Sequence, residues 1–141
     1  MEKIKNFWLV KFAPFRTSWD EIVKRGIFTM RGVRSPLARK NLSQMKIGDI
    51  VLFYHSQTQK AIVGVMEVAR ESYPDPTSAD PKWLTCDFRP LKSLPYPVTL
   101  LEIRKNEKLR NIPLVRQPKL SVMRISGDEF KKIINDTLGN D

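Results

Sequence analysis

The chain is poor in the residues that build disulfides and metal sites. Among its 141 residues, Cys86 is the only cysteine and His55 the only histidine. A single cysteine excludes an internal disulfide and a cysteine-rich zinc site, and one histidine leaves a structural zinc ion dependent on carboxylates for its other ligands. We therefore expect neither a metal ion nor a cofactor.

Long apolar runs are also absent. No stretch approaches the ~20 apolar residues that cross a bilayer, and the first residues lack the apolar segment and cleavage site of a signal peptide. We expect a cytoplasmic protein, or a nuclear one in a eukaryote, without a membrane partner. The length favours one domain over residues 1–141, and we expect it to be a monomer.

Acidic residues are few beside the basic ones. The chain has 25 Lys and Arg against 15 Asp and Glu, a formal net charge of +10. An excess of positive charge attracts polyanions at long range, so nucleic acid is the first partner class to consider. The alternative is a surface that only keeps the protein in solution, because net charge names no sequence or partner.

The clearest structural signal is a pair of strand-like segments. Residues 50–54 form an unbroken run of strand-favouring apolar residues, which predicts a strand buried on both faces. Residues 61–69 are rich in Val and Ile, and the short polar interval before them favours an antiparallel hairpin. Gly64 interrupts the second run and indicates a bulge, or a place where another backbone or a ligand approaches closely.

Helix starts are marked by capping sequences. Residues three apart that form capping boxes are Ser18 with Glu21, Thr99 with Glu102 and Ser126 with Glu129. Ser35 followed by Pro36 predicts an N-cap with proline in the first helical position. Gly26 and Gly139 are typical of helix ends.

The remaining segments predict short strands and connections. Residues 7–10 and 118–125 are expected to form the first and last strands, and residues 83–90 a half-buried strand that Pro90 ends. Cys86 on that strand is interpreted as a core residue. Residues 72–82 are expected to form a loop and residues 94–98 an extended linker. About five mostly antiparallel strands with short helices between them favour a small barrel.

Candidate functional residues follow from two of these segments. Tyr54, His55 and Ser56 bring an aromatic ring and two hydrogen-bonding side chains to the end of the buried strand. The alternative is that these polar groups satisfy one another within the protein. Arg39 and Lys40, on the helix capped by Ser35, could hold a phosphate, or they could simply be solvated surface charges.

Many short motifs in one order resemble the EVE domain, a branch of the PUA-like fold, over nearly the whole chain. They are Trp8-Leu9-Val10-Lys11 with Pro14, Ser18-Trp19-Asp20, Gly32-Val33-Arg34 with Ala38-Arg39, Met45-Lys46-Ile47-Gly48-Asp49, Phe53-Tyr54-His55-Ser56, Ile62-Val63-Gly64, Tyr73-Pro74-Asp75-Pro76-Thr77 and Leu120-Ser121-Val122. The resemblance implies an α+β pseudo-barrel of about five to six mostly antiparallel strands with short surrounding helices.

The resemblance also implies a function. The family is similar to readers that hold a modified base, such as a 5-substituted cytosine, in a pocket at one end of the pseudo-barrel, without catalysis. The implied pocket residues are Lys11, Phe12, Trp19, Met30, Arg34, Ser35, Tyr54, His55, Ser56, Leu120 and Ser121, and the implied phosphate-binding residues are Arg31, Arg39 and Lys40. Stacking and edge hydrogen bonds on an unstacked base call for this mixture of side chains. The partner is DNA or RNA.

The chain departs from the family pattern inside the implied pocket. Phe12-Ala13 stands where the family commonly has Ser-Glu, Met30-Arg31 where it has Trp-Asp, and Ser35-Pro36-Leu37 where it has Asn-Tyr-Gln. Loss of an aromatic ring and of a carboxylate is expected to change which base is accepted, and Arg31 makes the region more positive.

Two other functions are compatible with the sequence. A small PUA-like hydrolase acting on modified nucleosides could use Lys11, His55 and Ser56, although no nucleophile elbow is present. A protein-interaction module could use the proline-rich residues 72–82. Binding through phosphates would weaken steeply with salt, whereas an apolar protein contact would not.

Overall fold

The strand predicted at the centre of the fold, β3 (Ile50–His55), lies inside a sheet with the strand order β2-β5-β4-β3-β1-β6. The computed structural model describes residues 5–57 and 59–137. Within them the other strands are β1 (Phe7–Phe12), β2 (Phe28–Thr29), β4 (Ala61–Pro74), β5 (Leu84–Thr99) and β6 (Val122–Ile125). From Val51 to His55 every side chain of β3 is buried, which confirms the expectation from its apolar run.

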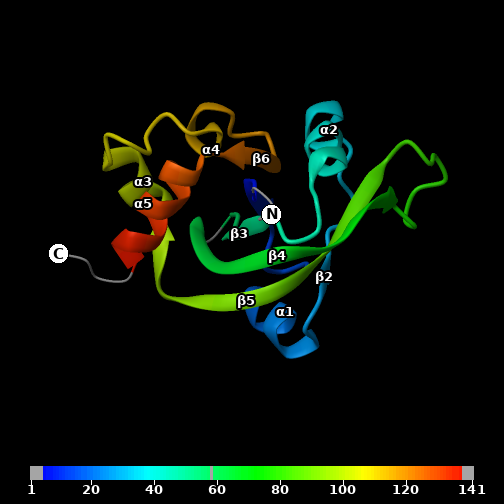
Figure 1. Ribbon diagram of the computed structural model, residues 1–141, viewed down its shortest axis with the longest axis horizontal. Helices are drawn as coiled ribbons and strands as arrows, with labels where there is room; N and C mark the ends of the chain where they lie inside the picture. Colours follow the sequence, from blue (N-terminus) through cyan, green and yellow to red (C-terminus); the bar gives the residue numbers. More distant parts are fainter. Residues whose placement is uncertain (1–4, 58, 138–141) are drawn as a thin grey trace.

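The sheet is mixed but mostly antiparallel. β1 and β3 are parallel, and every other pair of neighbouring strands is antiparallel, including the β3–β4 hairpin that the sequence predicts. β4 and β5 curve strongly around the core (Figure 1). This curved six-stranded sheet with its helices confirms the predicted α+β pseudo-barrel. Because β2 and β6 remain at the two edges, hydrogen bonds do not close the barrel among the described residues.

β5 is much longer than the sequence predicts. It continues through Pro90, Pro95 and Pro97, so the expectation that a strand ends at Pro90 and a linker follows is wrong. β2 pairs with β5 only at Phe28 and Thr29, which leaves one side of β5 open beyond that point. The pairing of β4 with β5 also skips from Ser93 to Val98. Proline is tolerated where no ladder bond is required, on an open edge or in a bulge.

Two other boundaries differ from the prediction. β4 runs on to Pro74, inside the segment expected to be a loop. The last strand, β6, begins at Val122 rather than at residue 118. A turn closed by the hydrogen bond from Leu120 N to Gln117 O occupies the preceding residues. Pro118, which has no N–H, lies in that turn.

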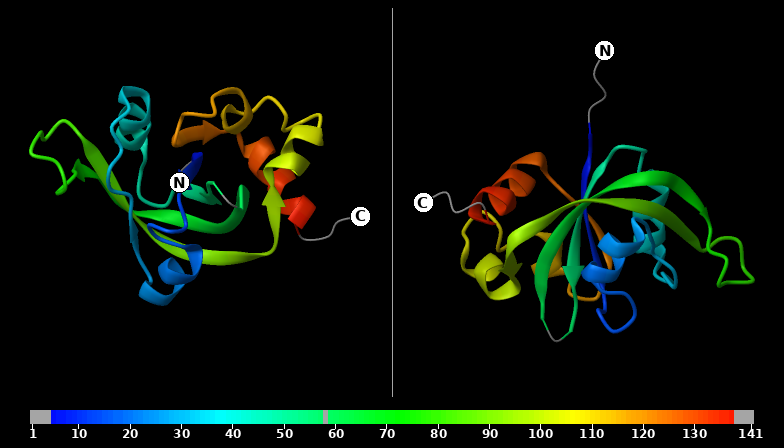
Figure 2. Two further views of the ribbon diagram at one scale, coloured as in Figure 1. Left: turned by 180° about the vertical axis from the view of Figure 1, so that it is seen from behind. Right: turned by 90° about the horizontal axis from the view of Figure 1, so that it is seen from below.

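The helices cover both sides of the β4–β5 ribbon. Their bounds are α1 (Trp19–Arg25), α2 (Pro36–Gln44), α3 (Leu100–Lys105), α4 (Pro113–Arg116) and α5 (Gly127–Thr137). α1 lies on one side of the ribbon, and α2 to α5 lie on the other (Figures 1 and 2). In the described residues, no helix is both long enough and apolar enough to span a bilayer.

The predicted helix caps are present. The capping boxes of α1 and α3 form as expected, and Ser126 N and Glu129 N each bond the other residue's side chain at the start of α5. Ser35 caps α2, and Gly26 ends α1 in the left-handed conformation. Gly139, the predicted end of the last helix, lies outside the described residues.

Gly64 lies where the side chain of Trp19 approaches β4 closely. A Cβ atom on Gly64 would stand 2.2 Å from the indole of Trp19, so only glycine leaves room for that ring. The register of β4 also shifts beside Gly64, which confirms the predicted bulge. The approach of Trp19 to β4 packs α1 against the sheet.

Cys86 is a core residue, as interpreted from its strand. It is fully buried beside Leu42, whose carbonyl oxygen lies 3.5 Å from its sulfur. Burial, with help from the negative charges of Asp87 and Glu71, raises the pKa of the Cys86 thiol to about 12. The thiol is therefore protonated at neutral pH and unreactive.

Candidate functional site

The carboxyl ends of β1 and β3 bring several predicted site residues together. The two strands are parallel, and their last pairs are Lys11 with Tyr54 and Phe12 with His55. Parallel strands end at the same edge of a sheet. The chain on either side is tied to that edge, because Ser56 N donates to Phe12 O at 3.0 Å and Lys11 N donates to Ser121 O at 2.9 Å.

His55 is held on both ring nitrogens. Its Nε2 accepts the backbone N–H of Trp19 at 2.9 Å, so this nitrogen carries no proton. The proton therefore resides on Nδ1, which donates to Oε1 of Gln59 at 2.6 Å. In this structure the ring serves to fix the start of α1 beside the end of β3.

Lys11 and Tyr54 are also built into the edge. Lys11 Nζ donates to the carbonyl oxygen of Pro118 at 2.6 Å and lies 6.0 Å from the centroid of the Tyr54 ring. Burial lowers the pKa of Lys11. Burial raises the pKa of Tyr54, against the opposing charge of Arg104. Lys11 thus connects β1 to the segment that precedes β6.

Trp19 and Met30 belong to the core. Trp19 is 5% exposed, packs on Gly64 and donates from Nε1 to Ser93 Oγ at 2.8 Å. Met30 is 2% exposed, and its carbonyl oxygen accepts from Thr85 Oγ1 at 2.7 Å. Both side chains therefore present almost no surface to a ligand that approaches from solvent.

Arg34 is held by the loop between β4 and β5. Its Nη1 donates to the buried Oδ2 of Asp75 at 3.0 Å, and Nη2 donates to Thr77 Oγ1 at 3.3 Å. Burial works to raise the pKa of Asp75, but hydrogen bonds from Gly32, Thr77 and Arg34 outweigh it and hold that pKa well below its usual value. In the described residues, no hydrogen bond, ion pair or ring contact joins Arg34 to Tyr54 or His55, which interact with Lys11, Trp19 and Gln59 instead.

A cavity of about 280 Å³ lies beside the end of β1 and receives its walls from β1, α1, β2 and their connections. It is lined by Phe12, Arg16, Thr17, Arg25, Ile27, Phe28, Thr29 and Arg31. Phe12 and Phe28 are 7% and 3% exposed and meet edge to face with their centroids 5.0 Å apart. Together they form an aromatic floor.

Arginine side chains surround this floor. The guanidinium carbon of Arg16 lies 4.4 Å from the centroid of the Phe12 ring, and its Nη2 donates to the carbonyl oxygen of Arg31 at 3.3 Å. Arg25 pairs with Glu21 at 3.1 Å, whereas the ion pairs of the described residues include neither Arg16 nor Arg31. The cavity therefore offers aromatic surface beside the guanidinium donors of Arg16 and Arg31, for which the described residues supply no carboxylate partner.

Only part of this cavity is made of residues that the sequence predicts. Phe12 and Arg31 were expected at the site, the latter as a phosphate ligand. The lining residues that were not predicted are Arg16, Thr17, Arg25, Ile27, Phe28 and Thr29. The available signal was the alternation of basic and aromatic residues on both sides of α1. Phe15, next to Arg16 and 77% exposed, belongs to the same pattern.

Four other predicted site residues line two other depressions. Ser35 and Leu120 face one of about 430 Å³ with Leu37 and the segment 117–119. Arg39 and Lys40 line another of about 670 Å³ beside Lys82. The structure thus divides the predicted site among neighbouring surfaces instead of gathering it in one pocket.

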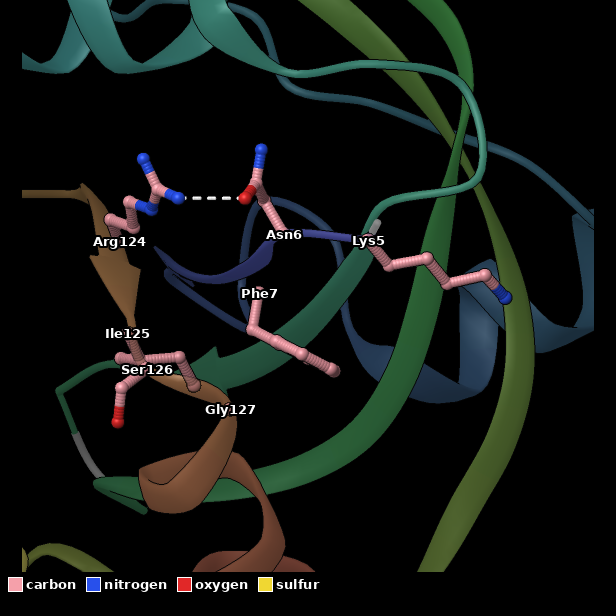
Figure 3. Close-up of a pocket in the computed structure, with 7 residues that line it drawn as sticks. All are labelled: Lys5, Asn6, Phe7, Arg124, Ile125, Ser126 and Gly127. Atoms are coloured by element: carbon pink, nitrogen blue, oxygen red, sulfur yellow. Dashed lines mark hydrogen bonds between the residues drawn. The ribbon is translucent and has the colours of Figure 1, made fainter. Parts of the chain in front are cut away.

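A further depression of about 630 Å³ lies at the opposite end of β1. Figure 3 shows its lining, in which Arg124 Nη2 donates to Asn6 Oδ1 at 2.6 Å. Phe7 there stacks on Phe130 with ring centroids 4.6 Å apart. None of the predicted site residues lines it. Nor do three or more His, Cys, Asp or Glu residues gather as metal ligands anywhere in residues 5–57 and 59–137.

The curved, mostly antiparallel sheet, its flanking helices and the small aromatic cavity at the end of β1 define a PUA-like α+β domain. The chain belongs to the EVE domain family, whose profile matches residues 6–136. The implied family is therefore confirmed over nearly the whole chain.

Similar proteins come from bacteria and eukaryotes. The crystal structure of Atu2648 from Agrobacterium tumefaciens is 37% identical with a TM-score of 0.91, over 94% of this chain and 92% of that one. Human thymocyte nuclear protein 1 is 27% identical over 96% of this chain and 75% of its own length. The crystal structure of human THYN1 in complex with 5-methylcytosine-containing DNA has a TM-score of 0.86 at 23% identity, over 97% of this chain and 100% of that one.

A more distant likeness is one of fold. The YTH domain of Zygosaccharomyces rouxii MRB1, solved in complex with N6-methyladenosine RNA, has a TM-score of 0.63 at 15% identity, over 96% of this chain and 88% of that one.

Proposed function

We propose that this protein is a non-catalytic nucleic-acid-binding module that holds a modified base, a 5-substituted cytosine or one similar to it, in the cavity beside β1. The observation that carries the proposal is the aromatic floor of Phe12 and Phe28, with Arg16 over the Phe12 ring and Arg31 in the same cavity lining. An unstacked base needs an aromatic or apolar face to replace its neighbours and donors for its edge. This cavity supplies both.

The related structures support this class of ligand. Human THYN1 is bound to DNA that contains 5-methylcytosine, and the yeast YTH domain to RNA that contains N6-methyladenosine. The net charge of +10 suits either nucleic acid. A methyl group on the base adds apolar surface that can be buried against the floor, which favours the modified base over the plain one.

Each part of the site has a task in this proposal. The base enters beside Phe12, where the guanidinium of Arg16 already lies over an aromatic ring and can stack on a second one. Arg31 is exposed at the rim and is placed to meet a phosphate. Lys11, Tyr54, His55 and Trp19 are positioning residues that hold the ends of β1, β3 and α1 together behind the cavity.

A binding titration tests this function. Fluorescence anisotropy with oligonucleotides that carry cytosine or 5-methylcytosine is expected to show tighter binding of the modified strand. Arg16→Gln should weaken that binding about tenfold, because it removes a charged planar donor from the cavity. Arg110→Gln is the matched control, since Arg110 is an exposed arginine outside the cavity lining. Equal binding of modified and plain strands across a panel of modified bases would refute the reader function, and unchanged binding by Arg16→Gln would refute this cavity.

No observation among the described residues favours the hydrolase. Both ring nitrogens of His55 are engaged by Trp19 and Gln59, and Cys86 is buried with its pKa raised to about 12. A nucleophile needs a base within hydrogen-bond reach, and no hydrogen bond joins Ser56 to His55 in the part of the chain that the structure describes. Incubation with modified nucleosides is expected to yield no product.

A further inference from the structure

Trp83 stands apart from the other tryptophans. Trp8 is fully buried and Trp19 is 5% exposed, whereas Trp83, at the end of the loop between β4 and β5, is partly exposed. Three cations surround its ring: Lys82 Nζ lies 5.0 Å, Arg39 Cζ 5.5 Å and Arg34 Cζ 6.0 Å from the ring centroid. A partly exposed indole among cations is the composition of a stacking platform for single-stranded nucleic acid.

The platform is fixed before any ligand arrives. Trp83 O accepts from Asp75 N at 2.8 Å, and Trp83 N donates to Asp80 O at 3.3 Å. The side chain of Asp75 is fully buried and holds Arg34 at 3.0 Å. The backbone of Trp83 and one of its cations therefore share a single buried carboxylate residue as their anchor, which lowers the entropy cost of binding there.

A basic groove adjoins the platform. Its volume is about 670 Å³, and it is lined by Pro36, Leu37, Arg39, Lys40 and Ser43 of α2 together with Lys82 and Leu84, the chain neighbours of Trp83. α2 packs against β5 beside the base of the projecting β4–β5 hairpin (Figure 1). The one carboxylate pairing with these lining residues among the ion pairs of the described chain is Asp80, 3.7 Å from Lys82. Positive charge therefore remains in excess along the groove.

The cations around the indole are not in close contact with its face. Their distances of 5.0 to 6.0 Å lie within the range of about 6 Å for a cation–π contact and extend to its limit. Arg70, by comparison, lies 3.8 Å from the centroid of the Tyr73 ring. A nucleotide would give both the indole and the cations a closer partner, because its base can stack on the indole face while its phosphates bind the cations.

We propose that Trp83 and the groove beside it form a second nucleic-acid contact, in which an unpaired nucleotide stacks on Trp83 and the adjoining phosphates bind Arg39, Lys40 and Lys82. This site lies on α2 and the start of β5, whereas the cavity for the modified base is built from β1, α1 and β2. The inference rests on the proposed function only in that the ligand is a nucleic acid. It requires no modification on the base.

Tryptophan fluorescence tests the stacking directly. Because Trp8 and Trp19 are buried, a nucleotide stacked on Trp83 should quench emission from this residue almost alone. An unmodified single-stranded oligonucleotide of about twelve nucleotides is expected to quench the wild-type protein, and Trp83→Phe should abolish the quench while it retains a ring for binding. Undiminished quenching in Trp83→Phe would overturn the proposal.

Affinity measurements give a second readout. Trp83→Ala is expected to weaken binding of the same oligonucleotide about tenfold, whereas Tyr96→Ala, which removes an aromatic ring that is 70% exposed and far along β5, should change it less than twofold. Thermal denaturation of each variant establishes that it is folded. Equal affinities for these two variants would overturn the stacking role.

The phosphate contacts are tested by salt dependence. Arg39→Gln and Lys82→Gln should each reduce the slope of log K against log salt by about 0.7, the value for one phosphate contact on a single strand. Lys92→Gln removes one exposed positive charge from β5 at a position outside the groove and should leave the slope unchanged. Equal slopes for all three variants would refute the groove as the phosphate site.

Failure of this proposal can be told apart from failure of the reader function. If Trp83→Ala binds plain strands normally while Arg16→Gln loses the preference for 5-methylcytosine, the second contact is refuted and the reader function stands. If Trp83→Ala is defective and the wild-type protein shows no preference for any modified base, the second contact stands and the reader function is refuted.

Discussion

The two ends of β1 use their polar groups in opposite ways. At the amino end, the buried carboxylate of Asp49 accepts from Asn6 N at 3.1 Å, Trp8 Nε1 at 3.0 Å and Lys46 N at 3.0 Å. At the carboxyl end, Arg16 and Arg31 border the cavity without a carboxylate partner in the described residues. One strand therefore connects an end where a buried carboxylate accepts from three donors to a cavity where two arginines have no carboxylate partner among the described residues.

This difference separates structure from binding. A buried group whose hydrogen bonds are all made inside the protein stabilises the fold and has little left for a ligand. Guanidinium groups over an aromatic floor add little to stability on the surface but can bind an electron-rich ring or a phosphate. Substitutions at the amino end should therefore change stability, and substitutions at the carboxyl end should change binding.

The largest effect is expected at the amino end. Asp49→Ala leaves three N–H donors without their acceptor, two of them on backbone nitrogens. The free energy of unfolding should fall by about 3 kcal/mol, because a buried donor without a partner costs about 1 to 3 kcal/mol. Urea denaturation measures it, with Asp20→Ala, an exposed carboxylate, as the control. A loss no greater than that of the control would contradict the structural role of this end.

A smaller loss of stability is expected behind the cavity. Gly64→Ala places a methyl group 2.2 Å from the Trp19 ring and should reduce the free energy of unfolding by about 2 kcal/mol, the usual cost of overpacking. In the control, Gly127→Ala, the new Cβ would meet Phe7 at 3.4 Å, an ordinary contact, and stability should hardly change. Thermal unfolding of the pair measures the difference. Equal melting temperatures would show that Trp19 does not need Gly64.

At the carboxyl end the expected effect is on binding. Phe12→Leu keeps an apolar side chain but removes one ring of the aromatic floor. Affinity for a 5-methylcytosine oligonucleotide should fall about fivefold, since stacking on an aromatic side chain contributes roughly 1 kcal/mol or more. The control is Phe7→Leu, which removes a ring stacked on Phe130 at the amino end. If Phe7→Leu weakened binding as much as Phe12→Leu, the contrast between the two ends would fail.

The smallest effect concerns pH. The pKa of Asp75 is held well below its ordinary value of 3.8, so its ionised form stabilises the folded state above that pH. This contribution is lost as pH falls below 3.8 towards the lowered value, by at most about 1 kcal/mol between pH 4 and pH 3. Urea denaturation at these pH values should show a shallower pH dependence for Asp75→Asn than for the wild type. Parallel pH curves for the two proteins would contradict this origin.

Local features of the fold were predictable because neighbouring residues cause them. The hydrogen bonds between Ser18 and Glu21 form within one helical turn, and the burial of β3 follows from its uninterrupted apolar run. The length of β5 was not predictable in this way. Its prolines are tolerated only because β2 is two residues long and because the register with β4 skips a segment. Neither fact is visible from the neighbours of Pro90.

The candidate site also combines residues that were predictable from their neighbours with residues that were not. Residues at the ends of β1 and β3 could be grouped in advance, because a buried apolar run that stops at Tyr54 and His55 marks where the sheet ends. The role of Arg34 could not be foreseen, since its partner Asp75 is 41 residues away and lies in a loop. Phe28 was not foreseen for a similar reason, because it contacts Phe12, which precedes it in the sequence by more than the length of α1.

By itself the amino-acid sequence determined the family, the helix caps, the central hairpin and the positive charge, because each depends on residue types close together in the chain or on their sum. Only the tertiary structure decided which side chains meet. In the fold, His55 hydrogen-bonds Trp19 and Gln59, Arg34 forms an ion pair with Asp75, and Arg16 lies over Phe12 beside an open cavity. Hydrogen bonds and ring contacts act over a few ångströms in space, so a partner far along the chain is settled by the fold alone.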